Sequence, residues 1–286
     1  MIVVSLVTQR VLPDRIKPAS PVQSLAEPAR DAAITYCAAR KACENGENEM
    51  SLTIRVAEPA DRRPAFDNVL APSFVLDELE PFDEFESKLD EGTTTLLVGV
   101  DESGAIVGAA VFVNIRAASA VVLRQMAIRE DLRGTGLGTR LYHAFLATLE
   151  ETEQPSLVLA EVQHPDHHEA HPRHGDPLSR LRFYDRFDAL ILDVPYYQPA
   201  LAPGLKPVYG LLLLALYVRP DLINPARTYL DPPENLLFAL RSLLYADGDP
   251  DEAAAAKLLS AASVSRVRLL PTSAYAEVVP GLPQAA

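Results

Sequence analysis

Three glycines and an arginine fall within one short turn, the stretch of this sequence best suited to hold a ligand. The turn reads Arg133-Gly134-Thr135-Gly136-Leu137-Gly138-Thr139. Glycines let the backbone approach a ligand closely and adopt positive φ angles. A strand-like run precedes the turn and a helical pattern follows it, so free N–H groups and the positive end of the helix would face the turn. This predicts an anion site suited to a pyrophosphate, with the Arg133 guanidinium beside a phosphate oxygen.

Two other nucleotide-binding motifs match this turn less well. A Walker A loop needs a lysine followed by serine or threonine, and the turn contains no lysine. A Rossmann fingerprint shares Gly134 and Gly136, and Glu161 lies where a ribose-binding acid belongs, but Thr139 replaces the third glycine. A nucleotide-dependent oxidoreductase therefore remains an alternative, as does a turn that is purely structural.

The elements that would position the turn can be read from hydrophobic patterns. Strand patterns cover residues 51–56, 93–100, 105–113, 120–128, 156–162, 189–194 and 211–218. Helical patterns cover residues near 60–70, 80–89, 137–149 and 178–187. A hairpin turn at residues 101–104 joins the second and third strands. This order predicts an α+β fold with a central crossover helix after the turn.

The glycine turn carries a resemblance to a known family. Arg133-x-x-Gly136-x-Gly138 resembles the Arg/Gln-x-x-Gly-x-Gly/Ala signature of the GNAT family of acyl-CoA N-acetyltransferases, and residues 120–131 look like that family's fourth strand. The resemblance covers about residues 51–218. It implies the acyl-CoA N-acyltransferase fold, with a mixed, mostly antiparallel central sheet and helices on both faces. It also implies acetyl-CoA as cosubstrate and no metal.

The resemblance assigns the cofactor-binding residues. Backbone amides of residues 133–139 would hold the pyrophosphate of acetyl-CoA. The backbone of Met126, Ala127 and Ile128 would bond to the pantetheine arm like an added strand, which makes no demand on the side chains. The oxyanion of the tetrahedral intermediate would meet a strand amide, and Ala127 is the candidate.

A second match supplies a candidate acid. The run from residue 182 to 187, Arg-Phe-Tyr-Asp-Arg-Phe, is similar to the family's Phe-Tyr element, whose tyrosine commonly protonates the departing CoA thiolate. Tyr184 takes that place, and a phenol stays protonated at neutral pH. The family pattern normally ends in Gly-Phe, whereas this chain has Asp188-Ala189, which leaves the register of the last helical turn open. A core tyrosine with a satisfied hydroxyl is the alternative.

A candidate general base lies at the end of the fifth strand. Glu161 follows four apolar residues, so partial burial would raise its pKa toward a useful range. A surface or structural glutamate is the alternative. Met126 is expected to fill the core with its side chain, whichever role its backbone plays.

Three further segments have candidate roles. Five of six histidines fall between residues 164 and 174, but three prolines exclude a regular helix there, so a solvated loop is favoured over a zinc site or an acceptor-pocket loop. Residues 77–86 carry six acids, which read as a solvated helix face or as the border of an amine site. Tyr196 and Tyr197 would close the acceptor cleft or belong to a packed loop.

Composition restricts the class of partner. The chain of 286 residues has a net charge of −13, which counts against nucleic acid or an anionic membrane as main partner. Two cysteines, Cys37 and Cys43, cannot form a disulfide framework, and no segment is long enough to span a membrane, so a cytoplasmic location is expected. Residues 1–50 read as an N-terminal appendage with a start codon placed too early as one explanation, residues 51–219 as the acetyltransferase domain, and residues 220–286 as a helical extension.

Together these observations predict an acetyl-CoA-dependent N-acetyltransferase. It would transfer an acetyl group directly to a primary amine of a small molecule or peptide, with Glu161 as base and Tyr184 as acid. A homodimer is an open expectation. The non-enzymatic alternative is an acyl-CoA-binding or regulatory module that has lost turnover.

Overall fold

The strands and helices follow the predicted order closely. A computed structural model of the protein describes residues 52–246 and 250–283. The strands are β1 (Leu52–Val56), β2 (Thr94–Asp101), β3 (Ile106–Ile115), β4 (Ala120–Ile128), β5 (Leu157–Gln163), β6 (Leu190–Leu192), β7 (Leu211–Val218), β8 (Tyr229–Leu230) and β9 (Val267–Pro271). The helices are α1 (Pro59–Ala65), α2 (Ala71–Ser73), α3 (Phe82–Asp90), α4 (Leu137–Thr152), α5 (Pro177–Asp185), α6 (Glu234–Ala246) and α7 (Glu252–Ala262).

Short helical turns connect several of these elements. They are η1 (Phe66–Leu70), η2 (Leu76–Glu78), η3 (Arg116–Ala118), η4 (Glu130–Leu132), η5 (Pro220–Leu222) and η6 (Thr272–Glu277). The hairpin predicted at residues 101–104 is present, and Asp101 Oδ1 accepts hydrogen bonds from the backbone N–H of Ser103 and of Ala105. Gly104 has φ of +83°, which glycine adopts without steric cost.

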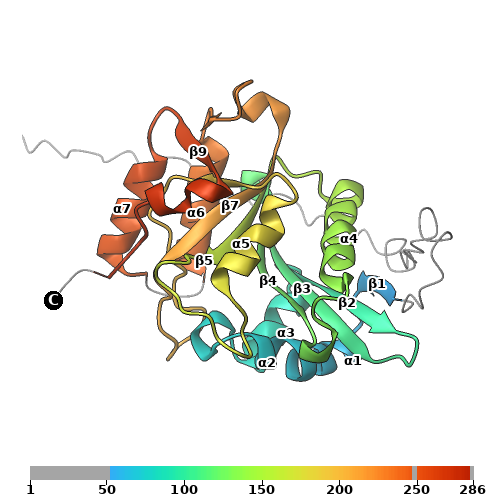
Figure 1. The fold of residues 1–286 in the computed structure, drawn as a ribbon. Coiled ribbons are helices and arrows are strands. Elements are labelled where there is room, and N and C mark those ends of the chain that lie inside the picture. Colours follow the sequence, from blue (N-terminus) through green and yellow to red (C-terminus); the bar gives the residue numbers. More distant parts are fainter. Residues whose placement is uncertain (1–51, 247–249, 284–286) are drawn as a thin grey trace, which may run out of the picture. The chain divides into compact units, whose positions relative to one another are not determined.

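The strands form one sheet in the order β1-β2-β3-β4-β5-β7-β6-β9-β8 (Figure 1). In the part of the chain that is described, β4 and β5 are the one parallel pair, and the other neighbours are antiparallel. The α+β class with a mixed, mostly antiparallel sheet is therefore confirmed. A doubly wound parallel sheet, which the dinucleotide-binding alternative requires, is not formed by these residues.

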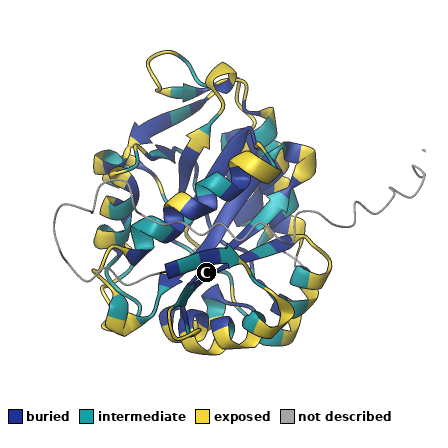
Figure 2. Cartoon of the chain, turned by 90° about the vertical axis from the view of Figure 1, so that its right-hand side faces the viewer, coloured by how far each residue is buried: buried dark blue, intermediate teal, exposed yellow. Residues whose placement is uncertain are grey.

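Helices cover both faces of the sheet, as predicted. On one face α4 and α5 pack on the sheet through buried residues such as Leu141, Phe145 and Leu181. On the other face α6 and α7 cover β5 and β7, while α1, η1 and α3 cover β2 and β3. Figure 2 shows the buried strands enclosed by helices whose outer surfaces are exposed.

The C-terminal region departs from the prediction. The sequence predicts a helical extension over residues 220–286, whereas this region also contains the strands β8 and β9. β9 pairs with β6 inside the sheet, and Thr272 and Val278 are both buried. The apolar residues Val267, Leu269 and Leu270 form too short a pattern to predict a strand from the sequence. Pairing with β6 is what makes this segment a strand.

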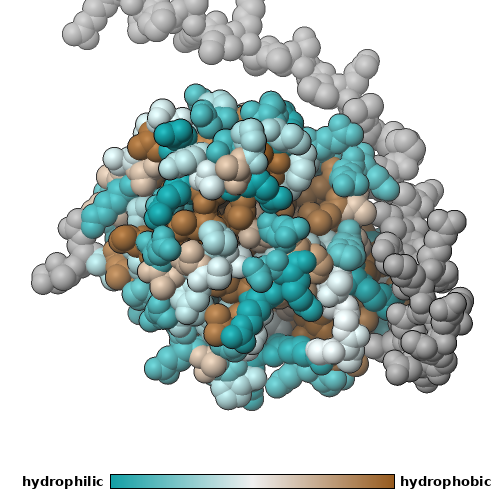
Figure 3. All heavy atoms as spheres, turned by 45° about the horizontal axis from the view of Figure 1, so that its top comes forward, coloured by the Kyte–Doolittle hydropathy of each residue, from teal (hydrophilic) through white to brown (hydrophobic). Residues whose placement is uncertain are grey.

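Some expectations lie outside the described residues. These are the N-terminal appendage over residues 1–50, its explanation by a start codon placed too early, and the two cysteines. Across residues 52–246 and 250–283, no helix combines the length and the apolar character that crossing a bilayer requires. On the face drawn in Figure 3, hydrophobic residues form small groups between hydrophilic ones.

Candidate active site

The site begins where the parallel strands β4 and β5 separate. Their pairing runs from Ala120–Leu157 to Leu123–Ala160 and then stops, although both strands continue. At the same point β4 carries a bulge, since Leu123 and Gln125 face neighbouring residues of β3 and Arg124 is the extra residue. Beyond this point Arg124–Ile128 and Glu161–Gln163 are adjacent strand ends that do not pair with each other.

A cavity of about 320 Å³ lies at this separation. Its wall includes the backbone segment Met126–Ile128, the turn residues Arg133, Gly134 and Gly138, and the two proposed catalytic residues Glu161 and Tyr184. The expected cofactor strand, glycine turn, base and acid therefore line one cavity. Of the remaining turn residues, Thr135, Gly136, Leu137 and Thr139 are not part of its wall.

The glycine turn leaves backbone donors open in front of α4. Gly134 and Gly136 have φ of +80° and +86°, and Gly136 caps α4 without any side-chain hydrogen bond to the helix. The first helical bond runs from Arg140 N–H to the Gly136 carbonyl, so the three amides before it have no helical partner. The Thr135 hydroxyl donates back to the Leu132 carbonyl at 2.7 Å and does not block these amides. The turn thus fits a diphosphate.

The Arg133 side chain makes two hydrogen bonds that the sequence does not predict. Its Nη1 donates to the Arg173 carbonyl at 2.6 Å, and its Nη2 donates to Ser73 Oγ at 3.2 Å. The guanidinium therefore ties together two rim segments of the cavity, α2 and residues 173–175, that lie far apart in sequence. Together with the bond from Nε to the Ile128 carbonyl at 3.3 Å, these contacts use three of the five guanidinium N–H donors.

The register of β4 corrects the predicted oxyanion donor. Ala127 faces Ala109, Ile128 faces Gly108, and Arg129 N–H donates to the Val107 carbonyl at 2.9 Å. In an antiparallel ladder with these bonds, the Ala127 N–H points toward β3. The expectation that Ala127 supplies this donor is therefore wrong. The N–H groups of Met126 and Ile128 are the ones that face away from β3, toward the separation.

Glu161 is the first residue of β5 beyond the stretch that pairs with β4. Its Oε1 accepts a hydrogen bond from the hydroxyl of Tyr196, and its Oε2 is buried and accepts no hydrogen bond from the described residues. Burial raises the pKa of Glu161, and Glu78 and Glu80 add to the increase, whereas the Arg124 charge and the Tyr196 hydrogen bond oppose it. A carboxylate with a raised pKa is suited to accept a proton near neutral pH.

A chain of polar side chains continues inward from this carboxylate. A small cavity of about 30 Å³ lies next to Glu161 and Arg180, and both residues also line the larger cavity. Arg180 Nη2 donates to Gln163 Oε1 at 2.6 Å, and Gln163 Nε2 donates to Glu78 Oε1. Burial lowers the pKa of Arg180. The inner end of the site therefore holds charged groups of both signs linked by hydrogen bonds.

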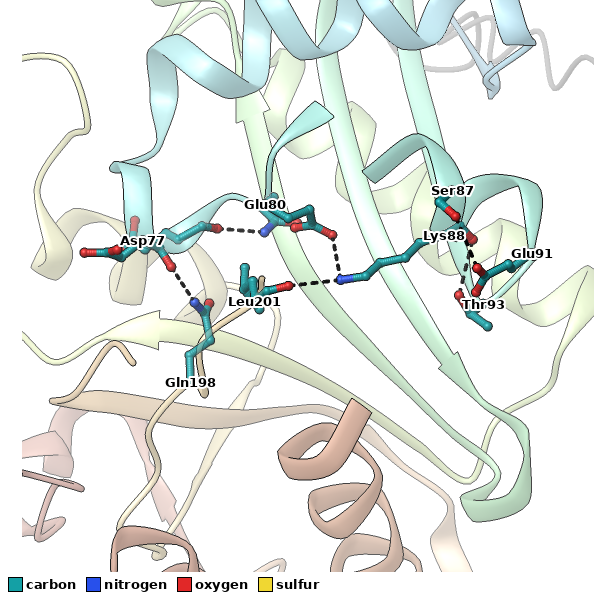
Figure 4. Close-up of polar contacts among 10 residues, drawn as sticks. Asp77, Glu80, Ser87, Lys88, Glu91, Thr93, Gln198 and Leu201 are labelled. Carbon is teal, nitrogen blue, oxygen red and sulfur yellow. Dashed lines mark hydrogen bonds and ion pairs between the residues drawn. The ribbon is translucent and has the colours of Figure 1, made fainter. Parts of the chain in front are cut away.

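The acidic stretch 77–86 divides into two parts. Glu78 and Glu80 are buried, whereas the acids of α3 lie on its solvated side, so the predicted solvated helix face describes only the second part. Lys88 Nζ lies 3.4 Å from Glu80 Oε1 and also donates to the Leu201 carbonyl (Figure 4). Gln198 Nε2 donates to the Asp77 carbonyl at 3.0 Å. These contacts connect η2 and α3 to the segment that carries Tyr196.

Tyr184 lies on α5 with 8% of its surface exposed, at the cavity wall. Burial raises its pKa, so the phenol is protonated at neutral pH. Its ring contacts Tyr142 edge-on at 5.8 Å. Asp188, where the family has glycine, adopts φ of +57° and lets Ala189 N–H reach the Tyr184 carbonyl. The helix therefore ends in the left-handed conformation that a glycine would adopt there.

Most of the histidine loop is exposed, as predicted, but His164 is buried. His164 is 2% exposed and its Nε2 donates to the Tyr275 carbonyl at 3.2 Å, while His168 Nε2 bonds to the Tyr209 carbonyl at 2.9 Å. Only His174 of this group lines the larger cavity. Within residues 52–246 and 250–283, no group of three His, Cys, Asp or Glu side chains could hold a metal ion.

Sequence reasoning missed Arg124, Arg180 and the partner of Tyr196. A weak signal existed for two of them, because Arg124 interrupts an otherwise apolar strand and Arg180 precedes Tyr184 by one helical turn. The bond between Tyr196 and Glu161 had no signal, since it joins residues on separate strands and loops.

Solved structures similar to this chain have low sequence identity to it. The ribosomal-protein-S18-alanine N-acetyltransferase from Escherichia coli is 16% identical, with a TM-score of 0.42 over 59% of this chain and 94% of that one. A GNAT family N-acetyltransferase (YhbS) from Escherichia coli in complex with CoA is 20% identical, with a TM-score of 0.39 over 60% and 84%. No curated protein sequence matches the chain.

A family model identifies the central part of the chain. The acetyltransferase (GNAT) family model matches residues 63–175, which run from α1 through the glycine turn to the residues just before α5. The match includes Met126–Ile128, residues 133–139 and Glu161, while Tyr184 and Tyr196 lie beyond it. Residues 63–175 of the protein therefore match the acetyltransferase domain of the GNAT family.

Proposed function

We propose that the protein is an N-acetyltransferase that moves the acetyl group of acetyl-CoA to a primary amine. The observation that carries the proposal is one cavity lined by the open glycine turn, by the end of β4 that does not pair with β5, by Glu161 and by Tyr184. Acetyl-CoA supplies the activated thioester. We further propose that residues 51–219 form the catalytic domain of a cytoplasmic enzyme.

The chain's own groups support direct transfer in a ternary complex. Amides of the glycine turn bind the diphosphate, and the free N–H groups of Met126 and Ile128 bind the arm and polarise the acyl oxygen. Glu161 accepts the proton that the amine loses as its nitrogen bonds to the acyl carbon. Tyr184 gives its proton to the sulfur as the C–S bond breaks, and the products are an amide and free CoA.

Binding and turnover are tested separately. We expect CoA to raise the melting temperature and NAD to leave it unchanged, because a ligand that binds only the folded state stabilises it. Mass spectrometry of amines incubated with acetyl-CoA and the protein should then find an acetylated product. Stabilisation by NAD and not by CoA would contradict the proposal. Binding of CoA without acetylation of any amine in a broad panel would favour the non-catalytic module.

A further inference from the structure

The C-terminal segment after β9 contacts each of the elements that carry the proposed catalytic groups. The Thr272 hydroxyl donates to Asp185, the residue next to Tyr184 on α5. The Tyr275 carbonyl accepts from His164, which directly follows β5 and its Glu161. Val278 is 3% exposed and belongs to the same buried cluster as Leu181 and Tyr184.

The closest approach is at Gly281, beside Tyr196. Gly210 N–H donates to the Gly281 carbonyl at 2.8 Å. A Cβ atom added at Gly281 would lie 2.6 Å from the Pro195 carbonyl oxygen and 2.7 Å from the Tyr196 carbonyl oxygen. Both contacts are with backbone, which has little freedom to move. Only glycine therefore fits here, and any larger residue displaces the backbone of Tyr196.

We propose that residues 272–281 are part of the active-site framework and that Gly281 is a positioning residue for the hydrogen bond between Tyr196 and Glu161. This inference rests on the proposed function only for the chemical meaning of Glu161. It assigns a role to a segment about a hundred residues beyond the matched family domain, which ends at residue 175. Tyr196 is 1% exposed, so its ring is packed against its neighbours. The position of its backbone therefore determines whether its hydroxyl reaches the Glu161 carboxylate.

The pKa of the Glu161 carboxyl group depends directly on the hydrogen bond from Tyr196. The charged and titratable groups around it are Arg124 from β4, Glu78 and Glu80 from the η2 region, and Tyr196. Arg180 and Tyr184 of α5 line the same cavity. Because the Tyr196 hydroxyl donates to the ionised carboxylate, loss of this bond favours the protonated form.

The test measures the pKa of Glu161 by NMR on the full chain labelled with ¹³C in glutamate carboxyl groups. Glu161→Gln identifies the resonance. Tyr196→Phe should raise this pKa by about one to two pH units, the amount that one hydrogen bond to a charged group can supply. Gly281→Ala should raise it in the same direction, and Val279→Ala should not, because the Val279 side chain is 74% exposed.

A double variant separates positioning from general damage. In the Tyr196→Phe background, Gly281→Ala should cause no further shift, since the bond it disturbs is already absent. An unchanged pKa in folded Gly281→Ala, or shifts that add in the double variant, would overturn the inference. If Gly281→Ala does not fold, a chain that ends at Val279 removes the same support without a clash and should raise the pKa.

Failure of this inference and failure of the proposed function give different results. CoA binding to each variant, measured by calorimetry, tests the cofactor site and needs no acceptor. Wild-type protein that does not bind CoA would remove the acetyltransferase assignment while leaving the NMR comparison valid. Normal CoA binding with no effect of Gly281→Ala on the pKa would remove only the positioning role.

Discussion

Tyr184 and Glu161 lie on different elements and on one cavity wall, and both have environments that favour the protonated state. Burial raises the pKa of each. In the proposed reaction this keeps a proton on Tyr184 for the sulfur and makes the Glu161 carboxylate a stronger base. At the residue scale the site is therefore suited to move one proton from the amine and another to the leaving group.

The first prediction concerns Tyr184. Tyr184→Phe should lower kcat by about 10²–10⁴-fold, the usual contribution of a positioned acid, without changing CoA affinity. Steady-state kinetics with the identified amine and calorimetry with CoA measure the two effects. Tyr142→Phe is the matched control, because Tyr142 is a neighbouring buried tyrosine that does not line the cavity. Equal losses in both variants would show a packing role instead.

The second prediction concerns the pH dependence of stability. The folded-state pKa of Glu161 is raised, so ionising this carboxyl costs stability as pH rises from its unfolded value of about 4.3 through the folded value. Glu161→Gln removes that cost and should abolish activity. Its melting temperature should match that of wild type at pH 4 and exceed it at pH 8. The increase should be about 2–4 °C for each kcal/mol by which ionisation of Glu161 destabilises the wild-type protein. A lower melting temperature at pH 8 would contradict the raised pKa.

At the scale of elements, the glycine turn determines how α4 presents its first amides. Gly136→Ala should weaken CoA binding, because φ of +86° costs a residue with a Cβ about 1–2 kcal/mol and the turn would relax away from this conformation. Gly92→Ala is the matched control, since Gly92 has φ of +70° in the exposed turn between α3 and β2 and caps no helix before the cavity. Calorimetry with CoA should show a loss only for Gly136→Ala. The same affinity in both variants would show that the turn does not bind the diphosphate.

The elements near the site were predictable because local patterns specify them. Short apolar runs indicated β2 to β5, and the glycine turn followed by a repeat of four indicated α4. The direction in which the β4 amides point was not predictable. It depends on the pairing of Ile128 with Gly108, and the bulge at Arg124 is visible only once β3 and β4 are paired.

Contacts made by distant segments were also beyond sequence reasoning. The carboxylate of Glu161 accepts a hydrogen bond from a tyrosine 35 residues away, and the carboxylate of Glu78 accepts one from Gln163, 85 residues away. The acidic stretch containing Glu78 has the composition of a solvated helix face. Its division into a buried and an exposed part follows from tertiary packing, which hydrophobic periodicity does not encode.

Over the described residues taken together, the C-terminal helices share a core with the sheet that holds the site. Buried residues of α6 and α7 form one cluster with residues of β4, β5 and β7. Residues 220–262 therefore stabilise the same strands from which Glu161 and the β4 amides extend. This predicts that the extension and the acetyltransferase domain unfold together.

The fourth prediction tests that shared core. Leu258 on α7 is fully buried, so Leu258→Ala should lower the free energy of unfolding by about 2–5 kcal/mol. Urea unfolding should keep a single transition, observed equally by far-ultraviolet circular dichroism and by tyrosine fluorescence. Leu259→Ala is the control, since Leu259 is only partly buried on the same helix and should cost less. Two transitions would show that the extension unfolds on its own.

Because the β4–β5 ladder ends early, hydrogen exchange at β4 can show whether a ligand occupies the site. The backbone amides of Met126 and Ile128 lie in the interior of the sheet, and no strand of the described residues lies opposite them. In the free protein they should exchange with deuterium much faster than the Ala127 amide between them, and a bound pantetheine arm should slow both. The difference in deuterium uptake between alternate residues of β4 would then show whether a ligand lies along this strand.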